Sequence, residues 1–329
     1  MKESIKINYP IFVTMNTFQI SGALENELPV DYSDRMGVYY SMSVSQNHKK
    51  NKGQFLTPAP IARFMGTLAN SERDCVTILD PGCGTAILSC AIIEKIVATD
   101  KNLKSVKLDV YEIDEDILPF TKNVLDFLRK WLKERNVEFH YNLFQDDFIL
   151  KNANVLKNEN LLFNNSISQE YDFIISNPPY FKLNKEDKRA KIAESITSGQ
   201  TNIYALFMAV SCKLLSKNGQ FIFITPRSYA SGSYFKAFRE FFFSNVLINQ
   251  IHLFDSRKDT FSRDNVLQET LIIKATRKDS GVSDTFVKIT SSKGLNDLSE
   301  PHLKIYPQSQ ILNLKSKEKI LHIPVNVEE

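Results

Sequence analysis

Val76-Thr77-Ile78-Leu79-Asp80-Pro81-Gly82-Cys83-Gly84-Thr85-Ala86 joins a predicted strand to a predicted helix through a glycine-rich turn. The apolar residues 76–80 are typical of a short buried strand, and residues 85–98 continue as a helix. The two glycines let the backbone turn tightly and approach a ligand closely. A strand, a tight turn and a helix in this order indicate an α/β unit.

The same alternation extends outward from this unit. Further strands are predicted at 107–112, 137–144, 171–176, 219–225, 247–254 and 267–276, and further helices at 114–135, 201–216 and 233–243. This pattern predicts an α/β fold with a doubly wound, mostly parallel seven-stranded sheet and helices on both faces. Ligands of such sheets bind beyond the carboxyl ends of the strands, so we expect the chemistry in the loops that follow strands.

Three regions are expected along the chain. Residues 1–50 are polar with scattered aromatic residues, and we expect an N-terminal helical cap there. Residues 51–278 carry the strand–helix alternation and form the main domain. Residues 279–329 are polar and lack a periodic apolar pattern, so they are expected to form a C-terminal extension. The asparagine-rich segment 151–170 is interpreted as an inserted surface loop.

Composition limits the classes of protein that fit. No apolar stretch reaches the ~18 residues of a membrane span, and the N-terminus lacks the apolar core of a signal peptide, so we expect a soluble cytoplasmic protein without membrane association. The four cysteines form no Cys-x-x-Cys pair, which argues against a zinc site or a disulfide framework. The net charge of +3 is too small to indicate nucleic-acid binding, although basic clusters lie at 48–52 and 182–191.

The glycine loop favours one class of cofactor. It departs from Gly-x-Gly-x-x-Gly, because the third small residue is missing and Asp80 opens the loop. A carboxylate there repels a pyrophosphate and attracts a cationic ligand, which favours S-adenosylmethionine, with its sulfonium and amino groups, over a dinucleotide. A nicotinamide-dependent dehydrogenase remains an alternative. Gly82 and Gly84 are the expected points of close approach.

Two later loops complete a predicted cofactor site. Glu112 ends the second strand, where an acidic side chain can accept hydrogen bonds from both ribose hydroxyls, and Ile113 would flank the adenine. Asp146 and Asp147 follow the third strand, and one of these two carboxylates could accept from the adenine amino group, with Phe148 packed on the ring. Each has a purely structural alternative: a solvated strand end for Glu112 and a helix cap for Asp147.

Asn177-Pro178-Pro179-Tyr180 follows the fourth strand. The Asn177 side chain and the backbone carbonyl beside it are two acceptors, held stiff by the prolines, and the Tyr180 ring is a flat face. This group suits a planar molecule with an exocyclic amino group. The alternative is a proline-rich turn that closes the strand. Upstream, Gly53–Pro60 has its own structural explanation, with Thr57 as the N-cap of a helix.

Taken together, these segments resemble the N6-adenine DNA methyltransferases of restriction–modification systems, in the motif order of the gamma group. The resemblance covers about residues 45–277, and Asn177–Tyr180 matches the catalytic tetrapeptide of that group. It implies the S-adenosylmethionine-dependent methyltransferase fold. It also implies a set of cofactor-binding residues: Gln54, Phe55, Thr57, Asp80, Gly82, Gly84, Glu112, Ile113, Asp147 and Phe148.

The resemblance further implies a reaction and its partners. The substrate would be an adenine flipped out of double-stranded DNA and stacked between Tyr180 and Phe261. Asn177 and the Pro178 carbonyl would accept from its amino group, with Pro179 in the same tetrapeptide and no metal involved. Phosphate contacts are expected from a basic run after the tetrapeptide: Lys182, Lys185, Lys188 and Arg189. A cognate restriction endonuclease or a separate recognition domain is the expected protein partner, since residues 279–329 offer at most the start of a target-recognition region.

Two other functions share part of this pattern. A methyltransferase that acts on protein glutamine or on RNA would have the same cofactor loops and tetrapeptide, but would leave the Gly53–Pro58 segment and Phe261 unexplained. A non-catalytic DNA-binding relic of a methyltransferase is a third interpretation, and the intact tetrapeptide argues against it.

Overall fold

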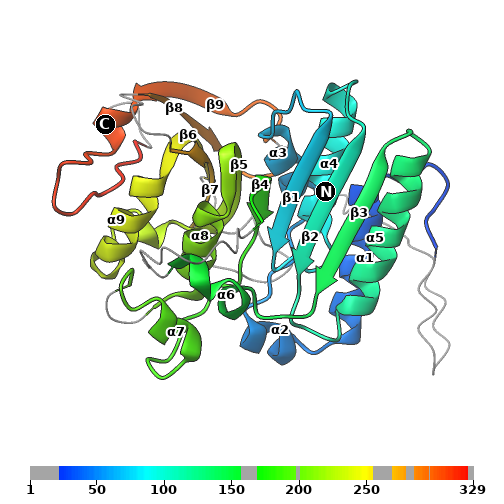
Figure 1. Ribbon diagram of the computed structural model, residues 1–329, viewed down its shortest axis with the longest axis horizontal. Coiled ribbons are helices and arrows are strands. Elements are labelled where there is room, and N and C mark those ends of the chain that lie inside the picture. Colours follow the sequence, from blue (N-terminus) through cyan, green and yellow to red (C-terminus); the bar gives the residue numbers. More distant parts are fainter. Residues whose placement is uncertain are drawn as a thin grey trace, which may run out of the picture.

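The computed structural model describes residues 22–156, 169–197, 201–254, 269–278, 285–295 and 297–324 (Figure 1). Phe261 lies outside these ranges. Within them, one twisted sheet of nine strands runs through the molecule in the order β3-β2-β1-β4-β5-β7-β6-β8-β9. The strands are β1 (Cys75–Pro81), β2 (Ser105–Tyr111), β3 (Glu138–Phe144), β4 (Tyr171–Ser176), β5 (Leu215–Pro226), β6 (Val246–Phe254), β7 (Thr270–Arg277), β8 (Phe286–Ser292) and β9 (His302–Pro307).

The first five strands of that order are parallel, as predicted. β7 is inserted antiparallel between β5 and β6, and all seven predicted strands are present. The central strands have continuous apolar runs because both of their faces are covered; all six residues of β4 are buried. Because β1 pairs in parallel with both β2 and β4, the carboxyl ends of these three strands lie at the same edge of the sheet.

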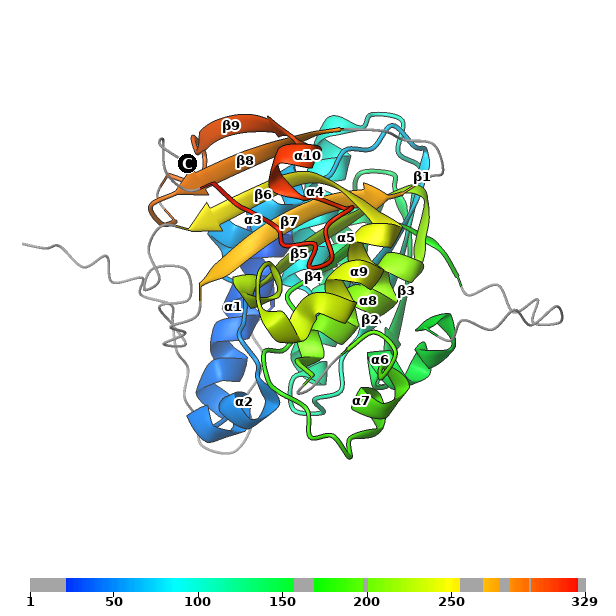
Figure 2. The same ribbon diagram turned by 90° about the vertical axis from the view of Figure 1, so that its left-hand side faces the viewer.

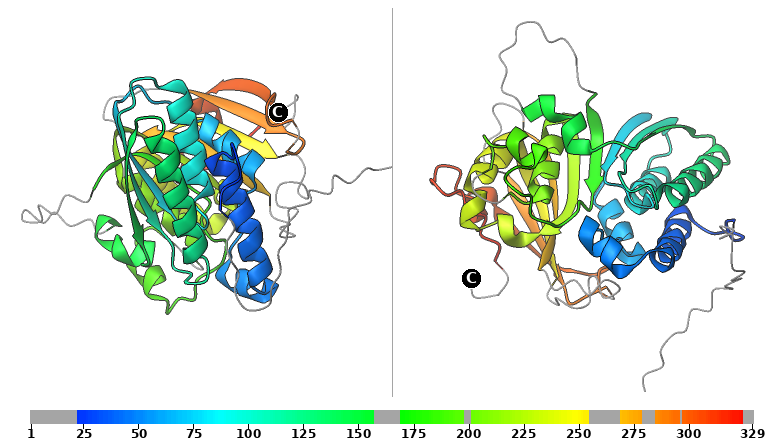
Figure 3. Two further views of the ribbon diagram at one scale, coloured as in Figure 1. Left: turned by 90° about the vertical axis from the view of Figure 1, so that its right-hand side faces the viewer. Right: turned by 90° about the horizontal axis from the view of Figure 1, so that it is seen from below.

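Helices cover both faces of the sheet (Figure 3). One layer packs around α4 and shares a core with β1 and β2, while the other packs around α8 and shares a core with β5, β6 and β7. The first layer contains α1 (Pro29–Ser43), α3 (Ala59–Thr67), α4 (Ile87–Thr99) and α5 (Leu118–Lys133), and the second contains α8 (Ile203–Lys213) and α9 (Lys236–Asn245). Within the described ranges, no helix combines the length and the apolar character that crossing a membrane requires.

The N-terminal helical cap is present in the described residues. α1 packs on α4 and α5, and its buried face includes Val30, Met36 and Tyr40. α2 (Gln46–Lys52) follows and lies below the sheet, near the carboxyl ends of the strands (Figure 1). The expected boundary at residue 50 falls inside α2, so the cap and the main domain share this helix.

The C-terminal region differs from the expectation of a separate extension. β8 pairs in parallel with β6, and β9 pairs antiparallel with β8, so residues of the 279–329 region continue the main sheet (Figure 2). α10 (Gln308–Ile311) then packs beside β9. Sequence reasoning missed these strands because only Val287 and Ile289 of β8 alternate inward, a pattern too short to stand out among polar neighbours.

Candidate functional site

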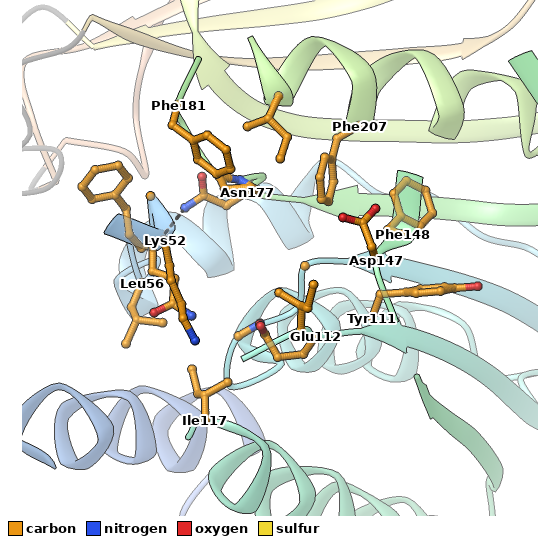
Figure 4. A pocket seen from close by; sticks show the side chains of 18 of the residues that line it. Lys52, Leu56, Tyr111, Glu112, Ile117, Asp147, Phe148, Asn177, Phe181 and Phe207 are labelled. Atoms are coloured by element: carbon orange, nitrogen blue, oxygen red, sulfur yellow. Dashed lines mark hydrogen bonds between the residues drawn. The ribbon is translucent and has the colours of Figure 1, made fainter. Parts of the chain in front are cut away.

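A cavity of about 340 Å³ lies at the edge of the sheet where β1, β2 and β4 end. Its lining comes from the α2–α3 connection, the glycine loop and the loops after β2, β3 and β4 (Figure 4). The sequence-predicted residues among its lining are Gln54, Phe55, Gly82, Gly84, Glu112, Ile113, Asp147, Phe148, Asn177 and Pro179. The lining extends from Lys52 to Phe207, so segments 155 positions apart in the chain meet around one space.

The glycine loop adopts a backbone that glycine favours. Gly82 and Gly84 have φ angles of +78° and +55°, and Ala86 joins them at +63°. The N–H groups of Gly82 and Cys83 both donate to the Tyr111 carbonyl at 2.9 Å, which ties the loop to the end of β2. A Cβ at Gly84 would lie 3.3 Å from Leu56, so the loop passes close to the neighbouring segment.

Glu112 points into the cavity from the end of β2 (Figure 4). One carboxylate oxygen accepts from the Gly84 N–H at 3.0 Å and the other from the Asp114 N–H at 2.8 Å. Only 7% of its surface is exposed, and burial raises the pKa of its carboxyl group. Glu112 is therefore an oriented acceptor rather than a solvated strand end.

Asp147 both caps a helix and lines the cavity. Its Oδ1 accepts from the Leu150 N–H at 2.9 Å and caps the short helix α6 (Phe148–Lys151). Its Oδ2 lies on the cavity side. Phe148 is buried behind it and packs against the rings of Tyr111 and Phe207, at centroid distances of 5.2 and 5.3 Å. This part of the cavity has an acceptor at its rim and an aromatic wall.

Asn177 is held in one orientation at the end of β4. Its Nδ2 donates to the Phe55 carbonyl at 2.9 Å and to Thr57 Oγ1 at 3.0 Å. Since a carbonyl can only accept, the amide nitrogen must face Phe55, and Oδ1 must face the other way. The tetrapeptide thus presents a fixed side-chain acceptor.

Tyr180 lies against that acceptor. Its hydroxyl is 2.5 Å from Asn177 Oδ1 and 3.1 Å from the Ile224 carbonyl. Its ring packs on Phe55 at 5.5 Å and edge-on against Tyr204 at 6.3 Å. Neither Tyr180 nor Pro178 lines the cavity, and both border it through Asn177 and Pro179.

Two residues predicted to contact a cofactor lie behind the cavity wall instead. Thr57 contributes its hydroxyl to the orientation of Asn177. Asp80 is 1% exposed and accepts from Ser89 Oγ at 2.7 Å, while its Oδ1 has no partner among the described residues. Burial raises the pKa of Asp80 to about 7. Both side chains are buried and neither lines the cavity.

The four basic residues expected to contact DNA after the tetrapeptide do not all face solvent. Lys182, Lys185 and Lys188 are exposed, as phosphate contacts require. Arg189 turns inward, lines the cavity and pairs with Asp187 at 2.6 Å and with Asp147 at 3.4 Å. Its guanidinium therefore does not share the exposed position of the three lysines: Asp187 caps α7 (Lys188–Ile192) and holds the guanidinium against the domain.

Comparison with known proteins agrees with this architecture. The family model described as Eco57I restriction-modification methylase matches residues 89–261, more than half of the chain. The chain belongs to this family. Among curated relatives, the Type II methyltransferase M.BsuBI of Bacillus subtilis is 31% identical over 284 residues, which cover 86% of this chain and 54% of the relative. The Type II methyltransferase M.PstI of Providencia stuartii is 30% identical, with 87% and 54% covered. This family member spans about half the length of these relatives.

Solved structures share the fold. A Listeria monocytogenes protein assigned to the class I S-adenosylmethionine-dependent methyltransferases superposes with a TM-score of 0.60 at 20% identity, covering 84% of this chain and 77% of the other. The DrdV–DNA complex gives a TM-score of 0.59 at 16% identity, covering 92% of this chain and 34% of the other. The Eco57I-family chain therefore has the S-adenosylmethionine-dependent methyltransferase fold.

One residue that sequence reasoning missed organises the rim of the cavity in this Eco57I-family member. Asp114 is fully buried and receives Lys52 Nζ at 2.6 Å, Tyr40 Oη at 2.6 Å, Gln54 Nε2 at 2.8 Å and His48 Nε2 at 3.0 Å. Burial alone would raise the pKa of Asp114, but the hydrogen bonds from Lys52 and Tyr40 outweigh it and hold the pKa below its usual value. The run Glu112-Ile113-Asp114 was visible in the sequence, but the donors to Asp114 lie 60 to 74 positions away.

Proposed function

We propose that this protein transfers a methyl group from S-adenosylmethionine to the N6 amino group of adenine in DNA, as the modification activity of a restriction–modification system. The observation that carries the proposal is Asn177: its amide is oriented by the Phe55 carbonyl and Thr57, so that Oδ1 is a fixed acceptor at the wall of the cavity. The family to which the chain belongs supports the same activity.

The cavity fits the cofactor. Its volume of about 340 Å³ lies within the range of small-molecule sites. Glu112 would hold the ribose hydroxyls, Asp147 the adenine amino group, and the Gly82–Gly84 loop would allow the amino-acid end to approach the backbone. The buried Asp80 carboxyl lies at the start of that loop, and its Oδ1 is an acceptor with no partner among the described residues. When bound, S-adenosylmethionine supplies an electrophilic methyl group on a sulfonium.

The tetrapeptide supplies the other half of the chemistry. Asn177 Oδ1 and the Pro178 carbonyl accept from the adenine amino group, which localises the nitrogen lone pair that is otherwise delocalised into the ring. In the structure the Tyr180 hydroxyl donates a hydrogen bond to Asn177 Oδ1. Rotation of the hydroxyl directs its proton to the Ile224 carbonyl 3.1 Å away instead, which frees Oδ1 for the substrate. The Tyr180 ring then offers a stacking face to the flipped base. Positioning and local electrostatics carry the rate.

DNA and a restriction partner complete the proposal. Target adenines are buried in the duplex, so the enzyme must flip them at a cost of a few kcal/mol. Lys182, Lys185 and Lys188 lie on the segment after the tetrapeptide and would hold the backbone. The names of the relatives, Type II methyltransferases, support a role beside a cognate endonuclease.

Nucleoside analysis tests the function. The protein is incubated with labelled S-adenosylmethionine and with duplex DNA, single-stranded DNA, RNA or protein acceptors side by side. Single-stranded oligonucleotides at high concentration remove the cost of opening the duplex. We expect N6-methyladenine in DNA; label in RNA or in glutamine side chains instead would overturn the assignment.

The Asn177→Ala variant tests the residue that carries the proposal. Methyl transfer should fall by a factor of about 10²–10³, as expected when a positioned hydrogen-bonding group is lost from the transition state. Calorimetric titration should show nearly unchanged cofactor affinity, because Glu112 and Asp147 are intact. Normal transfer by this variant would contradict the mechanism.

A further inference from the structure

Arg189 connects the cofactor cavity to the segment that follows the tetrapeptide. Its side chain is 22% exposed, and its guanidinium lies between the carboxylates of Asp187 and Asp147. Nε and Nη2 donate to Asp187 at 2.9 and 2.6 Å, and Nη1 lies 3.4 Å from Asp147 Oδ2. The guanidinium carbon also lies 5.8 Å from the centre of the Phe181 ring, directly after the tetrapeptide.

We infer that Arg189 is a positioning residue that aims Asp147 at the adenine ring of the cofactor, so that the segment after the tetrapeptide takes part in cofactor selection. The inference rests on the proposed function, because it concerns the same cofactor cavity. It assigns Arg189 to the cofactor rather than to DNA.

Asp147 needs such a partner to be selective. Its Oδ1 is committed to the Leu150 N–H at the cap of α6, which leaves Oδ2 as the acceptor on the cavity side. Arg189 contacts that same oxygen and restrains the remaining rotation of the carboxylate. An ionised carboxylate accepts but cannot donate. It therefore favours adenine, which presents an amino donor at position 6, and opposes hypoxanthine, which presents a carbonyl oxygen there.

Contacts on both sides of Arg189 in the chain hold the segment that carries it in place. Leu183, Ala193 and Ile196 are buried in the core around α8. The Leu183 N–H donates to the Thr201 carbonyl at 2.8 Å, and the Ile203 N–H donates to the Phe181 carbonyl at 3.0 Å. A packed segment therefore holds the guanidinium beside Asp147, while Lys188 on the same segment is exposed.

Ligand discrimination without DNA tests this inference. Calorimetric titrations of the full chain use S-adenosylhomocysteine and its deaminated analogue S-inosylhomocysteine. The wild type should favour the adenosyl ligand by at least about tenfold, the scale of a hydrogen bond to a charged group. Arg189→Ala should reduce this ratio about tenfold, and Arg189→Lys should restore part of it. Lys191→Ala is the matched control on α7, since Lys191 is exposed and pairs with Glu186, and it should keep the wild-type ratio.

The outcomes separate the inference from the proposed function. If Arg189→Ala weakens both ligands by the same factor, Arg189 only supports the segment and the inference is wrong. Equal affinity of the wild type for the two ligands also overturns it. If the wild type binds neither ligand, the proposed cofactor, and with it the proposed function, is wrong.

Discussion

Asp80 is a buried carboxyl group, and burial disfavours its ionised form. Ser89 satisfies one oxygen, while Oδ1 has no partner among the described residues. Burial raises its pKa from 3.8 to about 7, so the folded protein holds a proton that the unfolded chain has lost over much of that interval. Asp80 thus stabilises the fold in its protonated form and weakens it when ionised.

This balance predicts a pH dependence of stability. A raised folded-state pKa contributes stability that is fully present below about pH 4 and is lost as the pH rises to about 7. Between pH 5 and 7.5 the free energy of unfolding of the wild type should fall by about 2–3 kcal/mol relative to that of Asp80→Asn. Denaturant titrations of the two proteins at several pH values measure the difference. Parallel pH profiles would mean that Asp80 does not titrate in this range.

The connection between α2 and α3 is the element that joins the two halves of the site. Gly53 turns the chain there with a φ of +60°, and its carbonyl lies 3.4 Å from the Tyr180 N–H. A Cβ at position 53 would lie 2.8 Å from the Phe181 ring and 3.2 Å from the Tyr180 nitrogen. The tetrapeptide and this connection can approach only because residue 53 has no side chain.

Gly53→Ala should therefore damage the site. The left-handed backbone alone costs about 1–2 kcal/mol with an L side chain, and the added methyl group must displace Phe181 or the tetrapeptide. We expect methyl transfer to fall about tenfold or more, and cofactor affinity to fall with it. Gly22→Ala is the control, since a Cβ there meets nothing within 4 Å. Equal activity of both variants would contradict this account.

The exposed lysines after the tetrapeptide give a prediction about DNA binding. Replacing Lys182, Lys185 and Lys188 by alanine should weaken DNA binding similarly across sequences and reduce the slope of log affinity against log salt by about 2–3, at about 0.9 per phosphate contact. A matched triple variant at exposed Lys101, Lys122 and Lys133, two of which lie on α5, should keep the wild-type slope. Fluorescence anisotropy at several salt concentrations measures both. An unchanged slope in the first variant would remove this segment from the DNA interface.

Apolar periodicity and turn-forming residues were sufficient to predict the seven strands. Together with the family resemblance they predicted about half of the residues that line the cavity. Runs of apolar residues ending at glycine, proline or acidic residues mark where parallel strands deliver side chains, as for Glu112 and Asn177. The directions of other side chains depend on contacts between distant segments. Thr57 faces Asn177, Arg189 faces Asp147, and Asp80 is covered by the loop it opens. No local pattern distinguishes an arginine held by its own helix cap from one that faces solvent.

At the scale of the whole molecule, two apolar cores lie on opposite faces of one sheet, and β8 with β9 extends the sheet past β6. Val287 on β8 is fully buried, whereas its neighbour Phe286 is 70% exposed. The sheet therefore does not end with the last predicted strand, and the stability of the domain should depend on the added pair.

Substitutions at these two neighbours test that dependence. Val287→Asp places an unpaired charge in the core around α8 and should lower the free energy of unfolding by about 3 kcal/mol or more. Phe286→Asp should change it by no more than about 0.5 kcal/mol. Thermal and denaturant unfolding of both variants give the comparison. If Val287→Asp is as stable as Phe286→Asp, β8 is not part of the cooperative unit.

The two groups that orient the Asn177 amide lie 122 and 120 positions earlier in the chain. Contacts between such distant positions contribute stability only after the long loop between them has closed. The orientation of the Asn177 amide is therefore a property of the folded molecule and not of the tetrapeptide itself. A short peptide that contains only Asn177–Tyr180 lacks these two partners and, with them, the fixed acceptor.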